Sequence, residues 1–394
     1  MTLPLTLLAI IPNFYNQTSI PKLYTLVICT LLTMLFNKHL RIQKSTEFKI
    51  LVLLSTYYIY NQVRLEQDLE TFLLGSNGRY VGLIALIFLT IQFAFFSSIK
   101  LSELKIFMRF TFYSYFIINL IGLVIISKIT TINESGYTGG LSTTLQNSNF
   151  LSAYLGILIS LQIYFFLSKT NEPKFFQIIF FIIGVINLIA TKSIQGYFII
   201  FLSSILITVW KVSKNKHIKA IGVFTIIIMS SVLVRINDIV EWVILNGNVN
   251  ARLSYWELAI RIWRENIWFG VGLEQMRPNS ILYRDQLLTL QEGVIVAPDR
   301  SHNLILDQFV WGGLIAGILW LVFISLINYQ CIKLFILIKR QRVSNDFMYP
   351  IIIWSGFFFQ SLISVSPLTL TLMGFTSAGI IMSSKQNIKS SANI

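Results

Sequence analysis

The sequence predicts an all-α polytopic membrane protein in which one helical domain spans residues 1–394. Hydrophobic residues make up 55% of the chain and charged residues only 12%, and the mean hydropathy is +0.69. Long apolar runs recur along the whole chain, and a helix needs roughly 20 such residues to cross the hydrocarbon of a bilayer. Together these observations exclude an ordinary soluble domain.

Apolar runs give the predicted spans. The first run, at 3–12, lacks the basic residues and the cleavage site of a signal peptide, so we expect a short or re-entrant helix there. The full set predicts about 11–12 transmembrane helices. The other candidate spans lie at 22–36, 50–63, 80–98, 107–127, 149–168, 175–191, 194–210, 218–234, 304–332, 348–364 and 367–383.

Basic residues predict the orientation. One set of alternate loops carries 18 lysines and arginines, whereas the opposite short loops carry five. By the positive-inside rule the first set is cytoplasmic, so both termini lie in the cytoplasm and the large loop at 235–301 lies outside. Topology therefore accounts for most of the net charge of +14. Membrane lipid is the expected partner, and nucleic acid is not.

The large external loop contains arginine but no lysine. Seven of the 13 arginines lie between 235 and 300, and none of the 18 lysines does. Arginine binds the oxygens of phosphate and carboxylate groups in pairs, whereas lysine acts as a point charge. The loop therefore predicts a binding site for an anionic substrate.

Residues 252–266 of this loop have the pattern of an amphipathic helix in the plane of the membrane interface. Arg252 has no obvious carboxylate partner, which favours anion binding. Arg261 and Arg264 fit the solvated face of an interfacial anchor equally well. The expected apolar face consists of Leu253, Trp256, Ile260 and Trp263.

Glycine-rich and polar segments surround this helix in the sequence. We expect a turn at 269–272 and an irregular segment at 274–299 that suits a lid. Gly313 and Gly317 have the spacing that lets helices pack closely. The external segment at 134–149 is rich in glycine, hydroxyl and amide groups, which suits either binding of sugar hydroxyls or an ordinary polar connection.

His302 is the candidate proton acceptor. It follows Asp299-Arg300-Ser301 and precedes Asn303, at the start of an apolar span where an idle ionisable group would be costly. The near-neutral pKa of histidine suits it to accept a proton. His39 and His217 fall in lysine-rich loops, where we expect solvated side chains.

Neither a metal site nor a cofactor is predicted. Cys29 and Cys331 lie inside apolar runs and are expected to behave as small hydrophobic residues. No Asp-x-Asp-like pattern occurs on the external side, which favours metal-independent chemistry.

Several motifs, in this order, resemble the O-antigen ligase and O-antigen polymerase superfamily of bacterial membrane glycosyltransferases. Its signatures are similar to Gln146-Asn147-Ser148-Asn149, to Arg252-x-x-x-Trp256-x-x-Ala259 with Phe269-Gly270-Val271-Gly272, and to Asp299-Arg300-Ser301-His302-Asn303 with Gly312-Gly313-Leu314-Ile315-Ala316-Gly317. One motif departs from the family. Many relatives carry Ser-Arg-Gly at an earlier helix start, where this chain has Lys192-Ser193-Ile194-Gln195-Gly196.

The resemblance implies a GT-C-like fold and transfer of a glycan from a polyprenyl pyrophosphate, such as undecaprenyl pyrophosphate, to an acceptor hydroxyl. The partners are then this donor and a glycan or glycolipid acceptor at the outer side of the bacterial cytoplasmic membrane. We expect His302 to be the base and Arg252 and Arg300 to clamp the pyrophosphate. Arg277 is a weaker third candidate, and Asn303 completes the substrate-binding set.

The sequence also allows other functions. A repeat-unit polymerase of the same superfamily needs the same donor and base as an O-antigen ligase. A transporter of a small anion such as bicarbonate would use the arginines as its binding site, although the spans carry few ionisable residues to line a path. An inactive scaffold is disfavoured because His302 and Arg252 occur together.

Overall fold

The computed structural model describes residues 19–36, 45–66, 68–76, 79–127, 140–168, 174–211, 248–284 and 297–392, together with Leu5 and Ala9. Within these residues the chain is helical and contains no strand, which confirms the all-α fold class. The elements are α2 (Ser19–Phe36), α3 (Thr46–Leu65), α4 (Leu69–Leu74), α5 (Leu83–Phe96), α6 (Leu101–Ile126), η1 (Thr143–Leu145), α7 (Ser148–Leu167), α8 (Lys174–Ala190), α9 (Gln195–Lys211), α12 (Asn248–Glu265), α13 (Met276–Leu282), α15 (Leu304–Lys339), η2 (Asn345–Phe347), α16 (Met348–Ile363) and α17 (Leu368–Ala392).

Every predicted span inside the described residues contains a helix. The span at 218–234 lies outside them, as does nearly all of the run at 3–12. Among the described helices, length and apolar composition suffice for membrane crossing in Leu101–Ile126, Ser148–Leu167, Leu304–Lys339 and Asn345–Ile363. Shorter apolar helices occupy Ile20–Leu35, Leu83–Phe96, Gln177–Ala190 and Gln195–Lys211.

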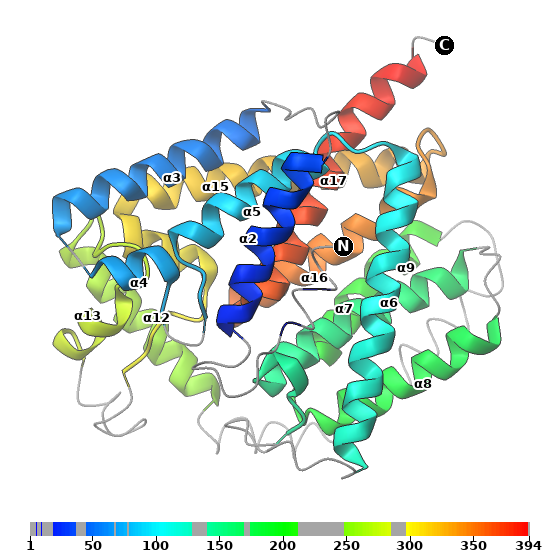
Figure 1. The fold of residues 1–394 in the computed structure, drawn as a ribbon, viewed down its shortest axis with the longest axis horizontal. Coiled ribbons are helices and arrows are strands. Elements are labelled where there is room, and N and C mark those ends of the chain that lie inside the picture. The colour runs from blue at the N-terminus through cyan, green and yellow to red at the C-terminus, as the bar shows by residue number, and fades with distance from the viewer. Residues whose placement is uncertain are drawn as a thin grey trace.

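In one part of the bundle the helices pack around α7. This helix is buried along most of its length and packs against α8, α9 and α16. On the other side of the bundle α3 runs beside α15, and α17 lies between α5 and α16 (Figure 1). Because α7 contacts protein on several sides, almost all of its residues are apolar, small or internally hydrogen-bonded.

Polar side chains inside the bundle join neighbouring helices. The amide of Asn187 on α8 donates to the side-chain oxygen of Asn119 on α6 at 2.8 Å. A β-carbon at Gly122 would lie 2.6 Å from Asn187 Oδ1, so the glycine makes room for this pair. Interhelical hydrogen bonds of this kind stabilise packing where lipid provides no hydrophobic driving force.

A kink divides α15 near its start. Gly312 and Gly313 have non-helical backbone angles, and Gly313 has φ of +61°. A β-carbon on Gly313 would lie 2.3 Å from the carbonyl carbon of Trp268. The expected helix–helix approach at Gly313 and Gly317 is therefore wrong. Gly313 instead admits the turn after α12, and Gly317 lies against Phe309 of its own helix.

The turn at 269–272 docks on this kink through its backbone. Val271 N donates to Val310 O and Gly272 N donates to Trp311 O, both at 2.8 Å. Gly270 and Gly272 have φ of +65° and +100°, angles that glycine adopts without a steric cost. The predicted glycine turn is confirmed, and it fixes the position of α12 relative to the start of α15.

The amphipathic helix is present as α12, and the residues that it buries against the protein are not those of the expected apolar face. Leu258, Ala259 and Ile262 are the buried residues, whereas Leu253 is 49% exposed. The helix carries apolar residues on two sides. Since α12 packs against α15, the tertiary contact decides which of these sides is covered.

The start of the expected irregular segment is also ordered. Residues 276–282 form α13, and Glu274 is buried. The prediction of an irregular segment is therefore wrong for these residues, and 285–296 lie outside the described residues. Burial of Glu274 in an ion pair requires a fixed backbone at this point.

Candidate active site

Helices α7 and α9 begin close together at one end of the bundle. Ser193, just before α9, donates to the side-chain oxygen of Asn149 in α7 at 2.7 Å. Gly196 N of α9 donates to Ser152 Oγ of α7 at 2.8 Å. Arg79 lies 5.1 Å above the ring of Phe150, also in the first turn of α7. Because helix N-termini carry partial positive charge and Arg79 lies beside them, this end of the bundle suits an anion.

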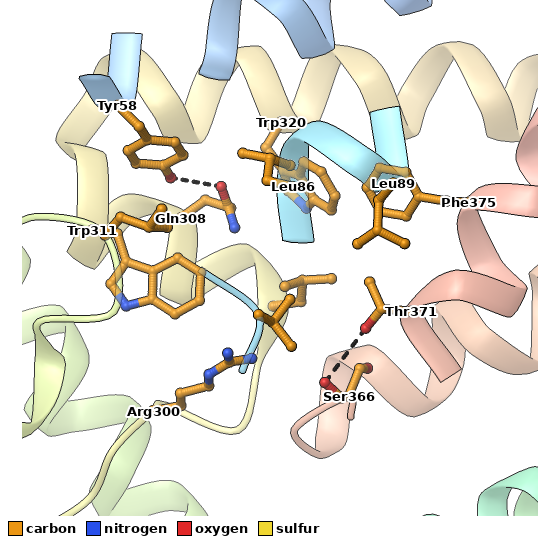
Figure 2. A pocket seen from close by; sticks show the side chains of 13 residues that line it. Tyr58, Leu86, Leu89, Arg300, Gln308, Trp311, Trp320, Ser366, Thr371 and Phe375 are labelled. Atoms are coloured by element: carbon orange, nitrogen blue, oxygen red, sulfur yellow. Dashed lines mark hydrogen bonds between the residues drawn. The ribbon is translucent and has the colours of Figure 1, made fainter. Parts of the chain in front are cut away.

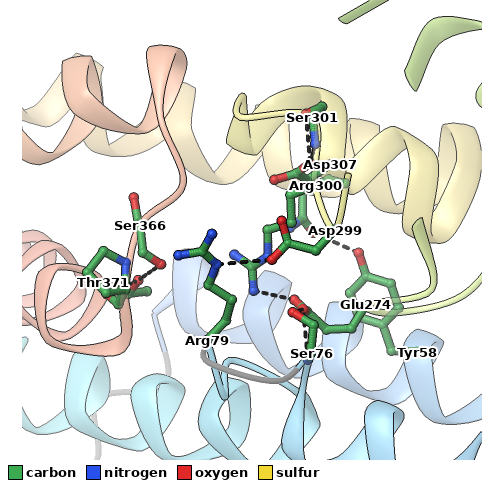
Figure 3. A network of polar contacts seen from close by, with 12 residues as sticks. Tyr58, Ser76, Arg79, Glu274, Asp299, Arg300, Ser301, Asp307, Ser366 and Thr371 are labelled. Atoms are coloured by element: carbon green, nitrogen blue, oxygen red, sulfur yellow. Dashed lines mark hydrogen bonds and ion pairs between the residues drawn. The ribbon is translucent and has the colours of Figure 1, made fainter. Parts of the chain in front are cut away.

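A buried ion pair forms the floor of the site. Arg300 Nη2 lies 2.5 Å from Glu274 Oε1, and the two side chains are 2% and 0% exposed. Glu274 Oε2 also accepts from the backbone N–H and the hydroxyl of Ser76 (Figure 3). The guanidinium of Arg300 lies 5.0 Å from the ring of Trp311. One network thus ties together the segments before α5, before α13 and before α15.

Arg300 is held as a cation by this network. Burial by itself would lower the pKa of Arg300, but the carboxylates of Glu274, Asp307 and Asp299 outweigh it and raise the pKa. Glu274 and Asp299 lie in loops of the site, and Asp307 lies in the first turn of α15. Its Nε has no hydrogen-bond partner among the described residues.

A second set of hydrogen bonds shapes the start of α15. Asp307 Oδ1 accepts from the backbone N–H of Ser301 at 2.8 Å and from its hydroxyl at 2.6 Å. The side-chain oxygen of Asn303 accepts from the N–H groups of Ile305 and Leu306, which makes it the N-cap. The oxygen of this predicted substrate ligand is thus engaged in capping.

These bonds hold His302 in an unusual conformation. Its φ is +61°, in a region that residues with a β-carbon rarely adopt. The ring is half-buried and lies 5.4 Å from the ring of Tyr255 on α12. Its Nδ1 is buried without a hydrogen-bond partner in the part of the chain that the structure describes. Backbone strain of this kind is frequent at functional sites.

The pKa of His302 is lowered to about 4. Burial is the main cause, and the positive charges of Arg79, Arg252 and Arg300 lower the pKa further, whereas Asp299 opposes them. The imidazole is consequently neutral at physiological pH, the form that can accept a proton.

Arg252 reaches the site from α12. Gln195, with its amide oriented to satisfy its neighbours, accepts from Arg252 Nη2 and from Ser364 Oγ, both at 3.2 Å, and donates to Asn149 O at 3.3 Å. Arg252 is half-buried, and burial lowers the pKa of its guanidinium. The arginine therefore bridges α12 to the starts of α7 and α9 and to the turn before α17.

Arg79 joins the site from the loop before α5. Its Nε lies 3.0 Å from Asp299 Oδ2, and the two side chains are 19% and 21% exposed. Burial would raise the pKa of Asp299, but Arg79, Arg300 and His302 outweigh it and hold the pKa below its usual range. The sequence shows Arg79 only as a basic residue in a short loop, 220 positions from its partner.

The predicted residues thus fall into two groups. His302, Arg252 and Arg300 come together with Asp299 around one site. Arg277 is exposed on α13 and, among the described residues, its side chain makes no hydrogen bond or ion pair with the site. Lys192, where many relatives have the Ser-Arg-Gly motif, is exposed as well.

Sequence reasoning missed Arg79, Glu274, Tyr255 and Gln195. Glu274, Tyr255 and Gln195 lie close in sequence to the recognised motifs, which was their only signal. Arg79 is far from these motifs and had no signal of this kind. Among the described residues, no three His, Cys, Asp or Glu side chains lie close enough to hold a metal ion.

An apolar cavity lies beside the buried ion pair. Arg300 and Trp311 face one side of it, and Ser366 and Thr371 face the other (Figure 2). Most of the remaining lining is aliphatic or aromatic. The cavity therefore continues from the polar site into the interior of the helical bundle.

The fold and the site define an all-α membrane protein that gathers arginines and a histidine where several helices begin. Residues 140–321 match the family model described as O-antigen ligase. This match confirms the resemblance and places the segment in the O-antigen ligase and polymerase superfamily, whose members are glycosyltransferase-type membrane enzymes. The segment includes Arg252 and His302 and leaves Arg79 outside. No curated protein matches the chain.

Proposed function

We propose that this protein transfers a glycan from a polyprenyl pyrophosphate carrier to an acceptor hydroxyl on the outer side of the bacterial cytoplasmic membrane. One observation carries the proposal. The half-buried, neutral His302 has an Nδ1 without a hydrogen-bond partner among the described residues and lies within electrostatic reach of Arg79 and Arg252. A proton acceptor next to cations is the combination that this transfer needs.

His302 acts as the general base in this mechanism. The acceptor oxygen forms a bond to the anomeric carbon of the donor as the bond from that carbon to the pyrophosphate oxygen breaks. The acceptor proton moves to the neutral imidazole of His302 and then to water. A positioned base of this kind typically contributes 10²–10⁴-fold to the rate.

Arg252 stabilises the pyrophosphate as it leaves with growing negative charge. Its half-buried position strengthens this interaction, since charges attract more strongly away from water. The N-termini of α7 and α9, beside Arg252, add partial positive charge. No step of this transfer requires a metal ion.

Arg300 has a different role in this proposal. Its guanidinium is buried and pairs with Glu274, so it positions the loop that carries Asp299 and His302. Arg277 lies exposed on α13 and serves as an interfacial cation. Asn303 caps α15 and thereby holds the backbone of His302.

Glycan transfer by the His302→Gln variant tests this function. Membranes that contain the wild-type protein are expected to elongate or transfer lipid-linked glycan, and the variant is expected to lose at least 10²-fold in rate. Arg277→Gln is the matched control, because it removes an exposed cation of the same segment. Full activity of His302→Gln at normal protein levels would eliminate His302 as the base.

A ligase and a polymerase differ in what accumulates when the gene is deleted. Loss of a polymerase leaves single repeat units on the final carrier, whereas loss of a ligase leaves long chains on the lipid carrier. We propose the ligase reaction, with the polymerase as the alternative. Electrophoresis of surface and lipid-linked glycan from a deletion strain distinguishes the two.

A further inference from the structure

Two arginine–carboxylate pairs lie next to each other in the site but differ in exposure. Arg300 and Glu274 are 2% and 0% exposed, whereas Arg79 and Asp299 are 19% and 21% exposed. Glu274 has further donors in Ser76. The Arg300–Glu274 pair is therefore closed to ligands, and the Arg79–Asp299 pair is open to them.

The geometry of the Arg79–Asp299 pair leaves N–H groups of Arg79 for a ligand. Arg79 contacts Asp299 through Nε, and a guanidinium has four further N–H groups on its two Nη atoms. The face of Arg79 lies over Phe150 at 5.1 Å, which holds the guanidinium plane at the start of α7. A phosphate group approaching the site can bind Arg79 through these N–H groups.

The same pair borders the proposed base. The charged groups that act on His302 are Asp299, Arg79, Arg252 and Arg300, and the ring of Tyr255 packs beside it. Asp299 favours the protonated imidazole, whereas the three arginines disfavour it. While Arg79 holds Asp299, its positive charge opposes the effect of this carboxylate on His302.

We propose that the Arg79–Asp299 ion pair is exchangeable, so that the donor pyrophosphate displaces Asp299 from Arg79 and frees the carboxylate to act on His302. Asp299 is then a positioning residue that couples donor binding to the basicity of His302. Arg79 becomes a ligand of the pyrophosphate. This inference rests on the proposed function, since it assumes a pyrophosphate donor and a histidine base.

The coupling has a clear physical direction. Binding of a pyrophosphate adds negative charge near Arg79 and releases the charge of Asp299. Both changes raise the pKa of His302 from its low value toward neutrality. A base works best when its pKa lies near the working pH, so the site becomes fully active only after the donor has bound.

Binding of farnesyl pyrophosphate to the purified full-length protein in lipid nanodiscs tests the exchange. Farnesol is the reference probe, because it has the same chain without the pyrophosphate. Asp299→Asn is expected to bind farnesyl pyrophosphate several-fold more tightly than wild type, because the competing carboxylate is gone. Arg79→Gln is expected to bind it about tenfold more weakly, equivalent to ~1.4 kcal/mol.

Glu47→Gln is the matched control. Glu47 pairs with Lys385 at 3.0 Å, the same separation as Arg79 and Asp299, but these two residues join α3 to α17 and take no part in the site. This variant is expected to bind farnesyl pyrophosphate as the wild type does. If the Arg79–Asp299 pair were purely structural, Asp299→Asn and Arg79→Gln would likewise bind farnesyl pyrophosphate as the wild type does and would change only the stability of the protein.

A second readout is the pH profile of glycan transfer. Asp299→Asn removes a charge that raises the pKa of His302, so the acidic limb of its profile is expected to move to lower pH. An unmoved limb together with unchanged farnesyl pyrophosphate affinities overturns the exchange and leaves the proposed function intact. Equal binding of farnesol and farnesyl pyrophosphate by the wild type overturns both.

Discussion

Gly313 of α15 lies directly against the backbone of Trp268, so close that a β-carbon on the glycine would sit 2.3 Å from the Trp268 carbonyl carbon. Leu314 N next to it donates to Ile267 O at 2.7 Å. This contact sets the turn after α12 into the kink of α15. Since Arg252 lies on α12 and His302 precedes α15, the contact also fixes the distance between the proposed clamp and the proposed base.

Gly313→Ala is expected to destabilise the protein and to abolish transfer. With φ of +61° and ψ of −155°, Gly313 lies in a backbone region that is essentially confined to glycine and costs a residue with a β-carbon on the order of 1–3 kcal/mol, and the clash with Trp268 adds to it. The midpoint of thermal unfolding in detergent and the transfer rate measure the two effects. Ile318→Ala is the control, because Ile318 is 48% exposed on the same helix. Equal unfolding midpoints for the two variants would contradict the prediction.

Glu274→Gln is expected to lower stability strongly, because it leaves the charge of Arg300 buried without its carboxylate. Breaking a buried pair on one side typically costs about 3–5 kcal/mol. The double variant Glu274→Gln, Arg300→Met is expected to recover part of the loss, since it removes the unpaired charge as well. Chemical unfolding of the single and double variants measures this difference. The prediction fails if the double variant is less stable than Glu274→Gln alone.

Arg252→Lys is expected to reduce transfer by about 10²-fold while the protein stays folded. Lysine keeps the charge but loses the paired N–H groups that bind phosphate oxygens, and losing one such donor typically costs 10²–10³-fold. Initial rates at saturating donor measure the effect. Arg264→Lys, an exposed position on the same helix, is the control and should transfer normally. Equal rates for the two variants would argue against a clamp at Arg252.

Stability is expected to fall with acid through His302. The pKa of His302 is about 4 in the folded protein, below its ordinary value of 6.5. The unfolded chain therefore takes up the proton first as the pH falls, so this stabilisation is complete above about pH 6.5 and is lost toward pH 4. The loss reaches roughly 3 kcal/mol.

Unfolding midpoints of the wild type and of His302→Gln between about pH 7 and pH 4.5 measure this contribution. The wild type is expected to lose more stability than the variant over this range. Parallel curves for the two proteins would show that His302 is not held neutral by the fold.

The sequence was a good guide to the helices because helix formation in a membrane protein depends on local properties. An apolar run long enough for the bilayer must satisfy its backbone groups internally, and a helix does so. The predicted helical regions therefore agree with the described helices. The sequence did not show which side of α12 is covered by protein, since Leu253 and Leu258 are both apolar and only the packing against α15 decides between them.

By itself, the sequence determined the all-α class, the resemblance to the O-antigen ligase superfamily and the candidates His302 and Arg252, because composition, motifs and residue chemistry are properties of the chain. Only the tertiary structure decided their partners. Arg79, Glu274 and Gln195 come from segments far apart in the chain, and no local pattern encodes such contacts. Their positions follow from how whole helices pack, and packing also separated the buried pair of Arg300 from the open pair of Arg79.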